Sequence, residues 1–186
     1  MQAIVKGILA AALLMASSRV ALAEDVIGHA SVVDGDTLMI HGISIRLWGV
    51  DAPKAGQFCR GEDGDQYRCS IEAANKLGTF IALRQVNCNP INLDRYGRTV
   101  ATCSVDGADL GEWLVRSGFA LDLPQYSRGK YGSVQHEAEQ AKRGIWKGSH
   151  VEPSLYRVCI RAGGRPVDCS NDANAHPWWH GKPCCR

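Results

Sequence analysis

The chain has 186 residues, of which 45% are hydrophobic and 22% are charged, and its formal net charge is +2. This length suits one domain, or one domain with a tail. The composition excludes a disordered chain and a collagen-like repeat. The small net charge excludes a protein that coats DNA through bulk positive charge, so any contact with nucleic acid needs a local site.

Residues 1–23 have the pattern of a secretory signal peptide. Lys6 supplies the positive charge, residues 7–16 form an apolar run, and Ala21-Leu22-Ala23 has small residues at the cleavage positions. The run is shorter than the roughly 20 residues of a membrane-spanning helix. We therefore expect cleavage after Ala23, no membrane span in the mature chain, and a location in the periplasm or outside the cell. Loss of Lys6 and Arg19 makes the mature chain about neutral.

All 8 cysteines follow the cleavage point, and an oxidising compartment favours disulfides. Cys59 and Cys69 bracket a polar loop, whereas Cys88 and Cys103 lie symmetrically about a turn, which suits a cross-hairpin bridge. Four further cysteines lie in the tail, and their pairing stays open: Cys159, Cys169, Cys184 and Cys185. A metal site formed by the last two with His176 and His180 is the minor alternative, because no CxxC pair is present.

The first half of the chain predicts mainly strands. Two strands over 31–41 are separated by the turn Asp34-Gly35-Asp36, and a third strand over 43–47 alternates apolar and polar residues. A hairpin follows later, with strands over 86–93 and 99–105. Five short strands of this kind predict a small barrel, for which the OB-fold is a good candidate.

Helices are predicted between and after these strands. We expect a helix over 70–84 capped by Ser70, a short helix over 110–117 capped by Asp109, and a third helix over 133–143 ended by Gly144. From His150 onward the periodicity is lost, and proline, glycine and asparagine are common.

The predicted organisation therefore has three parts. These are a signal peptide over 1–23, a barrel domain over 24–149, and a disulfide-held extension over 150–186.

Charged side chains gather at turns in three short segments. Asp36 and Asp51 each stand at a strand end, and two carboxylates with a backbone carbonyl and waters suit Ca²⁺ better than zinc. Spacing alone favours another interpretation, in which both are turn carboxylates bonded to their own backbone. Arg46 and Arg98 carry guanidinium groups that match a phosphate, although singly each is more often part of a surface salt bridge.

The three segments DGDT (34–37), IRLWGVDAP (45–53) and DRYGR (94–98), in that order, resemble the thermonuclease (staphylococcal-nuclease-like) family. The resemblance covers about residues 28–148. It implies a five-stranded OB-fold barrel with about three helices, and Ca²⁺-dependent hydrolysis of DNA or RNA to 3′-phosphate ends. It also implies site roles: Asp36, Asp51 and the Ala52 carbonyl as calcium ligands, Arg46 and Arg98 as catalytic phosphate-binding groups, Tyr96 beside the nucleotide, and Asp34 as a carboxylate behind the ligands.

Position 54 departs from this family pattern. The family has a glutamate there that orients or deprotonates the attacking water, and this chain has Lys54. A charged lysine cannot act as that base, and it could pair with Asp51 or Asp36 and displace the metal. Three outcomes follow: activity at a lower rate, replacement of the glutamate by Glu62 or Asp63, or a protein that binds without cutting. Because the other motif positions are intact, we rank a weakened or rebuilt active site slightly ahead.

A second function belongs to a different class. Some bacterial proteins that resemble this family are linked to exopolysaccharide (succinoglycan) production, so a non-catalytic role in the cell envelope is the alternative. The adjacent Trp178 and Trp179 in the tail could stack on a sugar or a base, or simply cover the barrel. The expected partners are DNA or RNA, with a polysaccharide at the tail as the alternative, and we expect a monomer.

Overall fold

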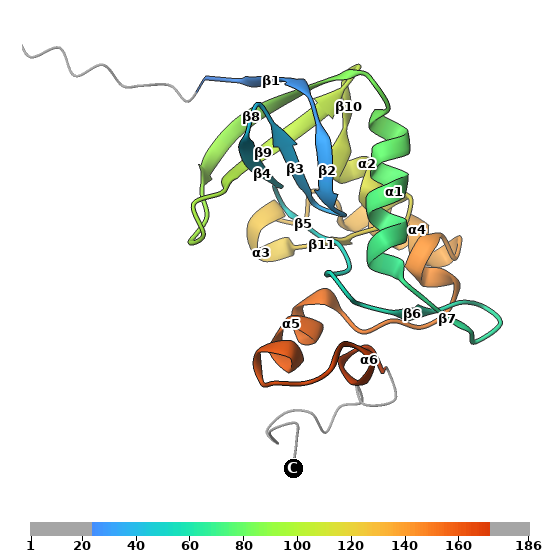
Figure 1. Ribbon diagram of the computed structural model, residues 1–186. Helices are drawn as coiled ribbons and strands as arrows, with labels where there is room; N and C mark the ends of the chain where they lie inside the picture. Colours follow the sequence, from blue (N-terminus) through green and yellow to red (C-terminus); the bar gives the residue numbers. More distant parts are fainter. Residues whose placement is uncertain (1–23, 172–186) are drawn as a thin grey trace, which may run out of the picture.

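The computed structural model describes residues 24–171 of the chain (Figure 1). The predicted signal peptide lies outside the described residues. So does the end of the tail, with its two last cysteines, His176, His180 and the tryptophan pair. Within residues 24–171, no helix is long and apolar enough to cross a membrane.

The main sheet has seven strands, six of which follow one another across it: β1 (Val26–His29), β2 (Ser31–Asp34), β3 (Thr37–Ile40), β4 (Ile43–Leu47), β8 (Gln85–Leu93) and β9 (Thr99–Val105). Their order across the sheet is β1-β8-β9-β4-β3-β2, and the short β10 (Ala108–Asp109) pairs with β9. Strands β4 and β9 run parallel, and the other neighbours are antiparallel.

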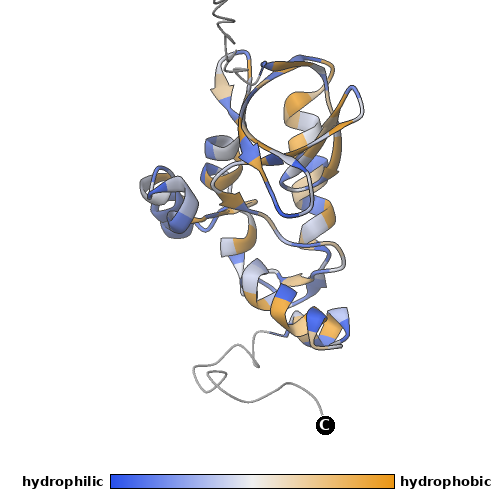
Figure 2. Cartoon of the chain, turned by 90° about the vertical axis from the view of Figure 1, so that its left-hand side faces the viewer, coloured by the Kyte–Doolittle hydropathy of each residue, from blue (hydrophilic) through white to orange (hydrophobic). Residues whose placement is uncertain are grey.

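The sheet closes on itself through its first segment. β1 and β2 lie at opposite ends of the strand order, yet only Ala30 separates them in the sequence. This bent segment therefore joins both edges of the sheet and produces a ring of strands, visible in Figure 2. Counted as one bent strand, it gives the five-stranded OB-fold barrel that the sequence predicts.

The barrel interior is apolar because alternate residues of each strand point inward. On β9, for example, Ala101, Cys103 and Val105 are buried, whereas the residues between them are partly exposed. Leu38, Ile45 and Leu47 fill the opposite side of the interior with almost no exposed surface. Burial of such aliphatic side chains contributes roughly 1.5–3 kcal/mol each.

The remaining elements surround the barrel: β5 (Val50–Asp51), β6 (Cys59–Arg60), β7 (Gln66–Tyr67), α1 (Cys69–Ile81), α2 (Leu110–Arg116), β11 (Leu121–Asp122), α3 (Pro124–Ser127), α4 (Gly132–Gln140), a 3₁₀ turn (Gly144–Lys147), α5 (Pro153–Arg161) and α6 (Pro166–Cys169). α1 packs along β2, and α2 lies between β9 and α4. α5 and α6 lie together at the end of the molecule below the barrel in Figure 1.

The three predicted helices are present as α1, α2 and α4, with one correction to their caps. Asp109 caps α2 as predicted, because its side chain accepts a hydrogen bond from the Glu112 amide. Ser70 does not cap α1. The helix begins one residue earlier, and the buried Ser70 hydroxyl donates to the Gln57 carbonyl at 3.4 Å. A tertiary partner has therefore replaced the local capping bond.

Three disulfides hold this part of the chain. Cys59–Cys69 and Cys88–Cys103 are the predicted pairs, and Cys159–Cys169 joins α5 to α6. Such bridges suit a protein of the periplasm or the cell exterior.

The predicted loss of regular structure after His150 is wrong for residues 153–169. These residues form α5 and α6 around a small cluster of Val151, Tyr156 and the two bridged cysteines. Each helix begins with a proline in its first turn, where the missing amide hydrogen has no intrahelical partner to lose.

Candidate functional site

The turn between β2 and β3 places two carboxylates at one end of the barrel. The Asp34 side chain accepts a hydrogen bond from the Asp36 amide at 3.0 Å, which fixes the turn. A Cβ atom on Gly35 would lie 2.7 Å from the Ala52 side chain and 2.9 Å from the Ala73 side chain, so only glycine allows this close approach. The turn therefore directs the Asp36 carboxylate into the protein, where it is 0% exposed.

Arg46 on β4 stands next to this carboxylate, because β4 pairs with β3 so that Thr37 lies opposite Arg46. One guanidinium nitrogen donates to Asp36 at 2.7 Å, and the other contacts Asp51 at 3.2 Å. The Ala52 amide also donates to Asp36, at 2.7 Å. Asp36 and Asp51 thus lie side by side beneath Arg46, as the resemblance implies.

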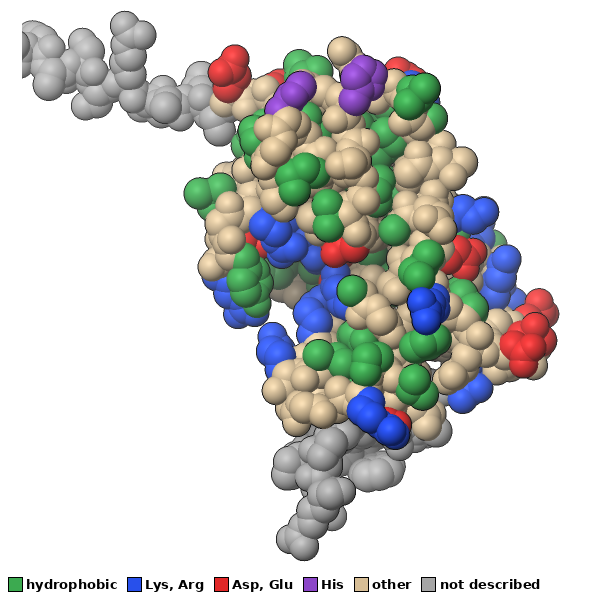
Figure 3. Space-filling model, viewed as in Figure 1, with side chains coloured by type: hydrophobic (Ala, Val, Ile, Leu, Met, Phe, Trp, Pro, Cys, Tyr) green, Lys and Arg blue, Asp and Glu red, His purple; other side chains and the backbone are tan. Residues whose placement is uncertain are grey.

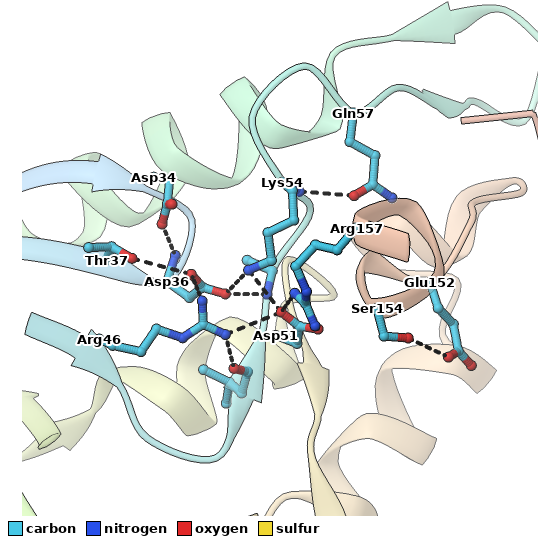
Figure 4. A network of polar contacts seen from close by, with 12 residues as sticks. Asp34, Asp36, Thr37, Arg46, Asp51, Lys54, Gln57, Glu152, Ser154 and Arg157 are labelled. Atoms are coloured by element: carbon cyan, nitrogen blue, oxygen red, sulfur yellow. Dashed lines mark hydrogen bonds and ion pairs between the residues drawn. The ribbon is translucent and has the colours of Figure 1, made fainter. Parts of the chain in front are cut away.

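The Lys54 ammonium lies between the same two carboxylates (Figure 4). Its Nζ is 2.6 Å from Asp36 Oδ2 and 2.8 Å from Asp51 Oδ1. The Lys54 side chain is 13% exposed, so this pairing is shielded from solvent. The residue at the departed position therefore bridges both predicted metal ligands, as a metal ion would.

A further cation reaches the site from the C-terminal segment. The Arg157 guanidinium on α5 makes two parallel hydrogen bonds to Asp51, at 2.6 Å and 2.8 Å. This two-pronged geometry is the strongest form of an arginine–carboxylate pair. The sequence analysis did not identify Arg157, which lies outside the family motifs. The one sequence signal near Arg157 is Pro153, because proline is common in the first turn of a helix and so indicates the helix that carries Arg157.

The cations keep both carboxylates ionised despite their burial. Burial raises the pKa of Asp36, but the charges of Lys54 and Arg46 outweigh it and lower that pKa to about 2. Burial likewise opposes ionisation of Asp51, and the Arg157 hydrogen bonds and the Lys54 charge lower its pKa below the usual value. For Asp34, burial and the neighbouring Asp36 charge raise the pKa.

These residues do not fit a calcium ion. Calcium takes six to eight oxygen ligands at about 2.3–2.6 Å, whereas the facing oxygens of Asp36 and Asp51 already bind the Lys54 ammonium. Arg46 and Arg157 bring two more positive charges to the pair, which would repel a divalent cation. The Ala52 peptide contributes its amide rather than its carbonyl to the described contacts. Among residues 24–171, no cluster of three or more His, Cys, Asp or Glu side chains could hold a metal.

A cavity of about 720 Å³ opens in front of these cations. Five basic side chains line it: Arg46, Lys54, Arg95, Arg98 and Arg157. The acidic lining consists of Asp34 and Asp94, while Asp36 and Asp51 lie behind the cations and do not line it. Figure 3 shows Lys and Arg side chains gathered between the barrel and the C-terminal helices.

The turn between β8 and β9 forms another wall of the cavity. Asp94 accepts hydrogen bonds from the Tyr96 and Arg98 amides, and its other oxygen accepts from the Arg98 guanidinium at 2.8 Å. The Arg98 guanidinium also lies 5.6 Å from the centre of the Tyr96 ring, whose side chain is exposed. The motif DRYGR therefore presents Arg98 and Tyr96 to the same cavity as Arg46.

Other predicted site residues are placed differently. Glu62 and Asp63 lie in the exposed turn between β6 and β7 and do not line the cavity. Neither of these two carboxylates therefore takes the place of the glutamate at the site. Trp48, which does line the cavity, packs against the barrel core.

Comparison with known proteins identifies the family of the chain. The family model described as staphylococcal nuclease homologue matches residues 44–148. The succinoglycan biosynthesis protein ExoI of Rhizobium meliloti (strain 1021) is 45% identical over 154 residues, which cover 82% of this chain and 80% of that protein. An uncharacterized endonuclease of Escherichia coli O157:H7 is 32% identical over 133 residues, covering 68% of this chain and 80% of that protein.

A more distant relative is the probable endonuclease LCL3 of Komagataella phaffii, 30% identical over 115 residues, or 56% of this chain and 49% of that protein. The family match runs from β4 to the 3₁₀ turn and includes two of the three motifs in full, with Arg46, Asp51 and Arg98. The chain therefore belongs to the staphylococcal nuclease family.

Proposed function

We propose that this protein binds the phosphodiester groups of a nucleic acid strand in the cationic cavity, without calcium and without hydrolysing them. The observation that carries the proposal is the Lys54 ammonium, which bridges Asp36 and Asp51 and turns a carboxylate site into a cationic one. Fixed guanidinium and ammonium groups bind phosphate oxygens directly. Exposed Tyr96 and Tyr126 at the cavity offer aromatic faces for bases.

Hydrolysis has little support in this geometry. Attack of water on phosphorus needs a group that positions or deprotonates the water. Asp36 and Asp51 are buried in ion pairs and do not line the cavity. Of the two carboxylates that do line it, Asp94 binds the Arg98 guanidinium and Asp34 accepts a hydrogen bond from the Asp36 amide. Family membership favours the other interpretation, Ca²⁺-dependent cleavage of DNA or RNA to 3′-phosphate ends, which ranks second here.

The test compares binding and cleavage by the purified mature protein, which we propose to be a secreted or periplasmic monomer beginning at Glu24. Fluorescence anisotropy of a labelled single-stranded oligonucleotide should show saturable binding in EDTA that CaCl₂ does not strengthen. The same oligonucleotide and a plasmid should remain intact in either solution. Cleavage that appears with CaCl₂ and stops with EDTA would establish the nuclease instead, and a lack of binding in EDTA would remove the proposed function.

A role in exopolysaccharide synthesis is the third candidate. It is favoured by the likeness to the Rhizobium meliloti protein, which extends over a longer stretch than the family model matches. An acidic polysaccharide also carries anions that suit guanidinium groups. In the anisotropy assay, succinoglycan that displaces the oligonucleotide at low concentration would favour this candidate. Failure of succinoglycan to compete would leave nucleic acid as the ligand.

A further inference from the structure

The C-terminal segment 151–171 contacts the loop that carries Lys54 at several points. The Gln57 side chain, which is 0% exposed, donates to the Val151 carbonyl at 2.6 Å. The Tyr156 hydroxyl donates to the Ala55 carbonyl at 3.0 Å, and the Phe58 amide donates to the Ser170 hydroxyl oxygen at 2.9 Å. Both ends of the segment are therefore attached to this short loop.

These contacts reach Lys54 itself through one side chain. The Lys54 backbone amide donates a hydrogen bond to the Gln57 side-chain oxygen at 2.9 Å. The nitrogen of the same Gln57 side chain donates to the Val151 carbonyl. The Cys159–Cys169 disulfide joins the two helices of the segment, so the contacts from α5 and from α6 belong to one unit. The segment thus fixes the backbone from which the Lys54 ammonium projects.

The same segment contributes a charge to the cavity. Arg157 lines the cavity, and its side chain is 37% exposed even though it is paired with Asp51. A guanidinium has five N–H donors, and the two bonds to Asp51 use two of them. The Asp51 side chain is 2% exposed, so its carboxylate binds the guanidinium on the side away from the cavity. The outer edge of the guanidinium faces the cavity.

We propose that the C-terminal segment 151–171 completes the anion site, and that Arg157 binds a phosphate of the ligand directly. This inference rests on the proposed function and adds to it a binding residue from outside the matched family domain, which ends at residue 148. Arg46, Lys54 and Arg157 form one group of cations around the two buried carboxylates, and Arg98 lines the same cavity. Such a site suits a ligand with successive phosphate groups rather than a single small anion.

The test uses Arg157→Gln with Arg161→Gln as its matched control. Arg161 lies one helical turn further along α5, is exposed, and does not line the cavity. The probe is a short fluorescein-labelled single-stranded oligothymidylate in EDTA. We expect Arg157→Gln to weaken binding about tenfold. We also expect it to reduce the slope of log K against log salt by about 0.7, the value for one lost phosphate contact on a single strand.

A purely structural role for Arg157 would give a different pattern. Arg157→Lys keeps the charge but loses the fork, so we expect it to retain the wild-type salt slope with an intermediate affinity. Circular dichroism and thermal unfolding of each variant check that the fold is kept. If Arg157→Gln binds with the wild-type affinity and salt slope while the wild-type protein binds well, the inference is wrong and the proposed function stands. If the wild-type protein itself does not bind in EDTA, both are wrong.

Discussion

A lysine side chain at position 54 changes the chemistry of the two aspartates beside it. Two adjacent carboxylates in a buried site repel each other, and each loses hydration free energy on burial. In this protein Lys54 lies between them, with Arg46 and Arg157 on either side. These three positive charges balance Asp36 and Asp51 and leave a surplus that faces the cavity. The Lys54 ammonium thus occupies the place between the two aspartates where the family resemblance implies a metal ion.

Restoring a carboxylate at position 54 should restore a calcium site. We expect the double variant Lys54→Glu/Arg157→Gln to bind Ca²⁺, because it places three carboxylates together and removes two of the opposing cations. Isothermal titration with CaCl₂ measures the gain, and a plasmid assay shows whether cleavage accompanies it. The control Lys76→Glu/Arg161→Gln, the same charge change at exposed positions of α1 and α5 that do not line the cavity, should bind no Ca²⁺. A double variant as inert as this control would contradict the assignment of these residues to one site.

The ionised state of Asp36 also makes a prediction about acid stability. Its pKa of about 2 in the folded protein lies below the ordinary value of 3.8. The ion pairs of Asp36 therefore contribute stability above pH 3.8, and this contribution is lost as the pH falls through about 2. By linkage the contribution is about 2 kcal/mol.

Lys54→Met removes the nearest charge, so the pKa of Asp36 should rise and the acid loss should begin at a higher pH. Urea unfolding measured from pH 7 to pH 2 tests this, with Lys76→Met as the control. Identical pH profiles for the two variants would show that Lys54 does not hold Asp36 in its ionised state.

At the scale of secondary-structure elements, α5 and α6 determine how firmly the Lys54 loop is held. The segment 151–171 that contains them contacts residues 55, 57 and 58, and one disulfide joins the two helices. The variant Cys159→Ser/Cys169→Ser should loosen these helices, because closing a loop of this length contributes up to about 3 kcal/mol. We expect faster amide hydrogen exchange over 153–169 and little change in β8 and β9, as measured by mass spectrometry. Uniform protection in the variant and the wild-type protein would contradict this role.

The elements differ in how well the sequence alone predicts them. The hairpin of β8 and β9 is evident because alternating residues and a tight turn are local features. The Asp109 cap is also local, since Asp109 and Glu112 are three residues apart. Ser70 shows the opposite case, because its hydroxyl binds a carbonyl thirteen residues away and no local rule indicates this partner.

The site shows the same limit more strongly. The motifs bring Asp36, Arg46, Asp51 and Arg98 together, and the sequence analysis names Lys54 as a residue that could pair with these aspartates. The Arg157 pair with Asp51 joins residues 106 positions apart. It depends on the packing of α5 against the loop after β5, which no periodicity in the sequence specifies.

For the whole molecule, the cavity is a local cationic region on a chain with little net charge. The barrel supplies Arg46 and Arg98, the loop after β5 supplies Lys54, and the C-terminal segment supplies Arg157. The segments around residues 46–54, 94–98 and 157 are far apart in the sequence and meet at one cavity (Figure 3). A protein of this kind binds its ligand through a few fixed contacts rather than through a basic surface.

The most direct test of the central claim is a calcium titration of the wild-type mature protein. The claim is that Lys54, and not a metal ion, bridges Asp36 and Asp51. Isothermal titration with CaCl₂ at neutral pH should show no saturable binding up to millimolar concentrations, and EDTA should leave oligonucleotide binding unchanged. Saturable binding of one calcium ion that is lost in an Asp36→Asn variant would contradict the claim.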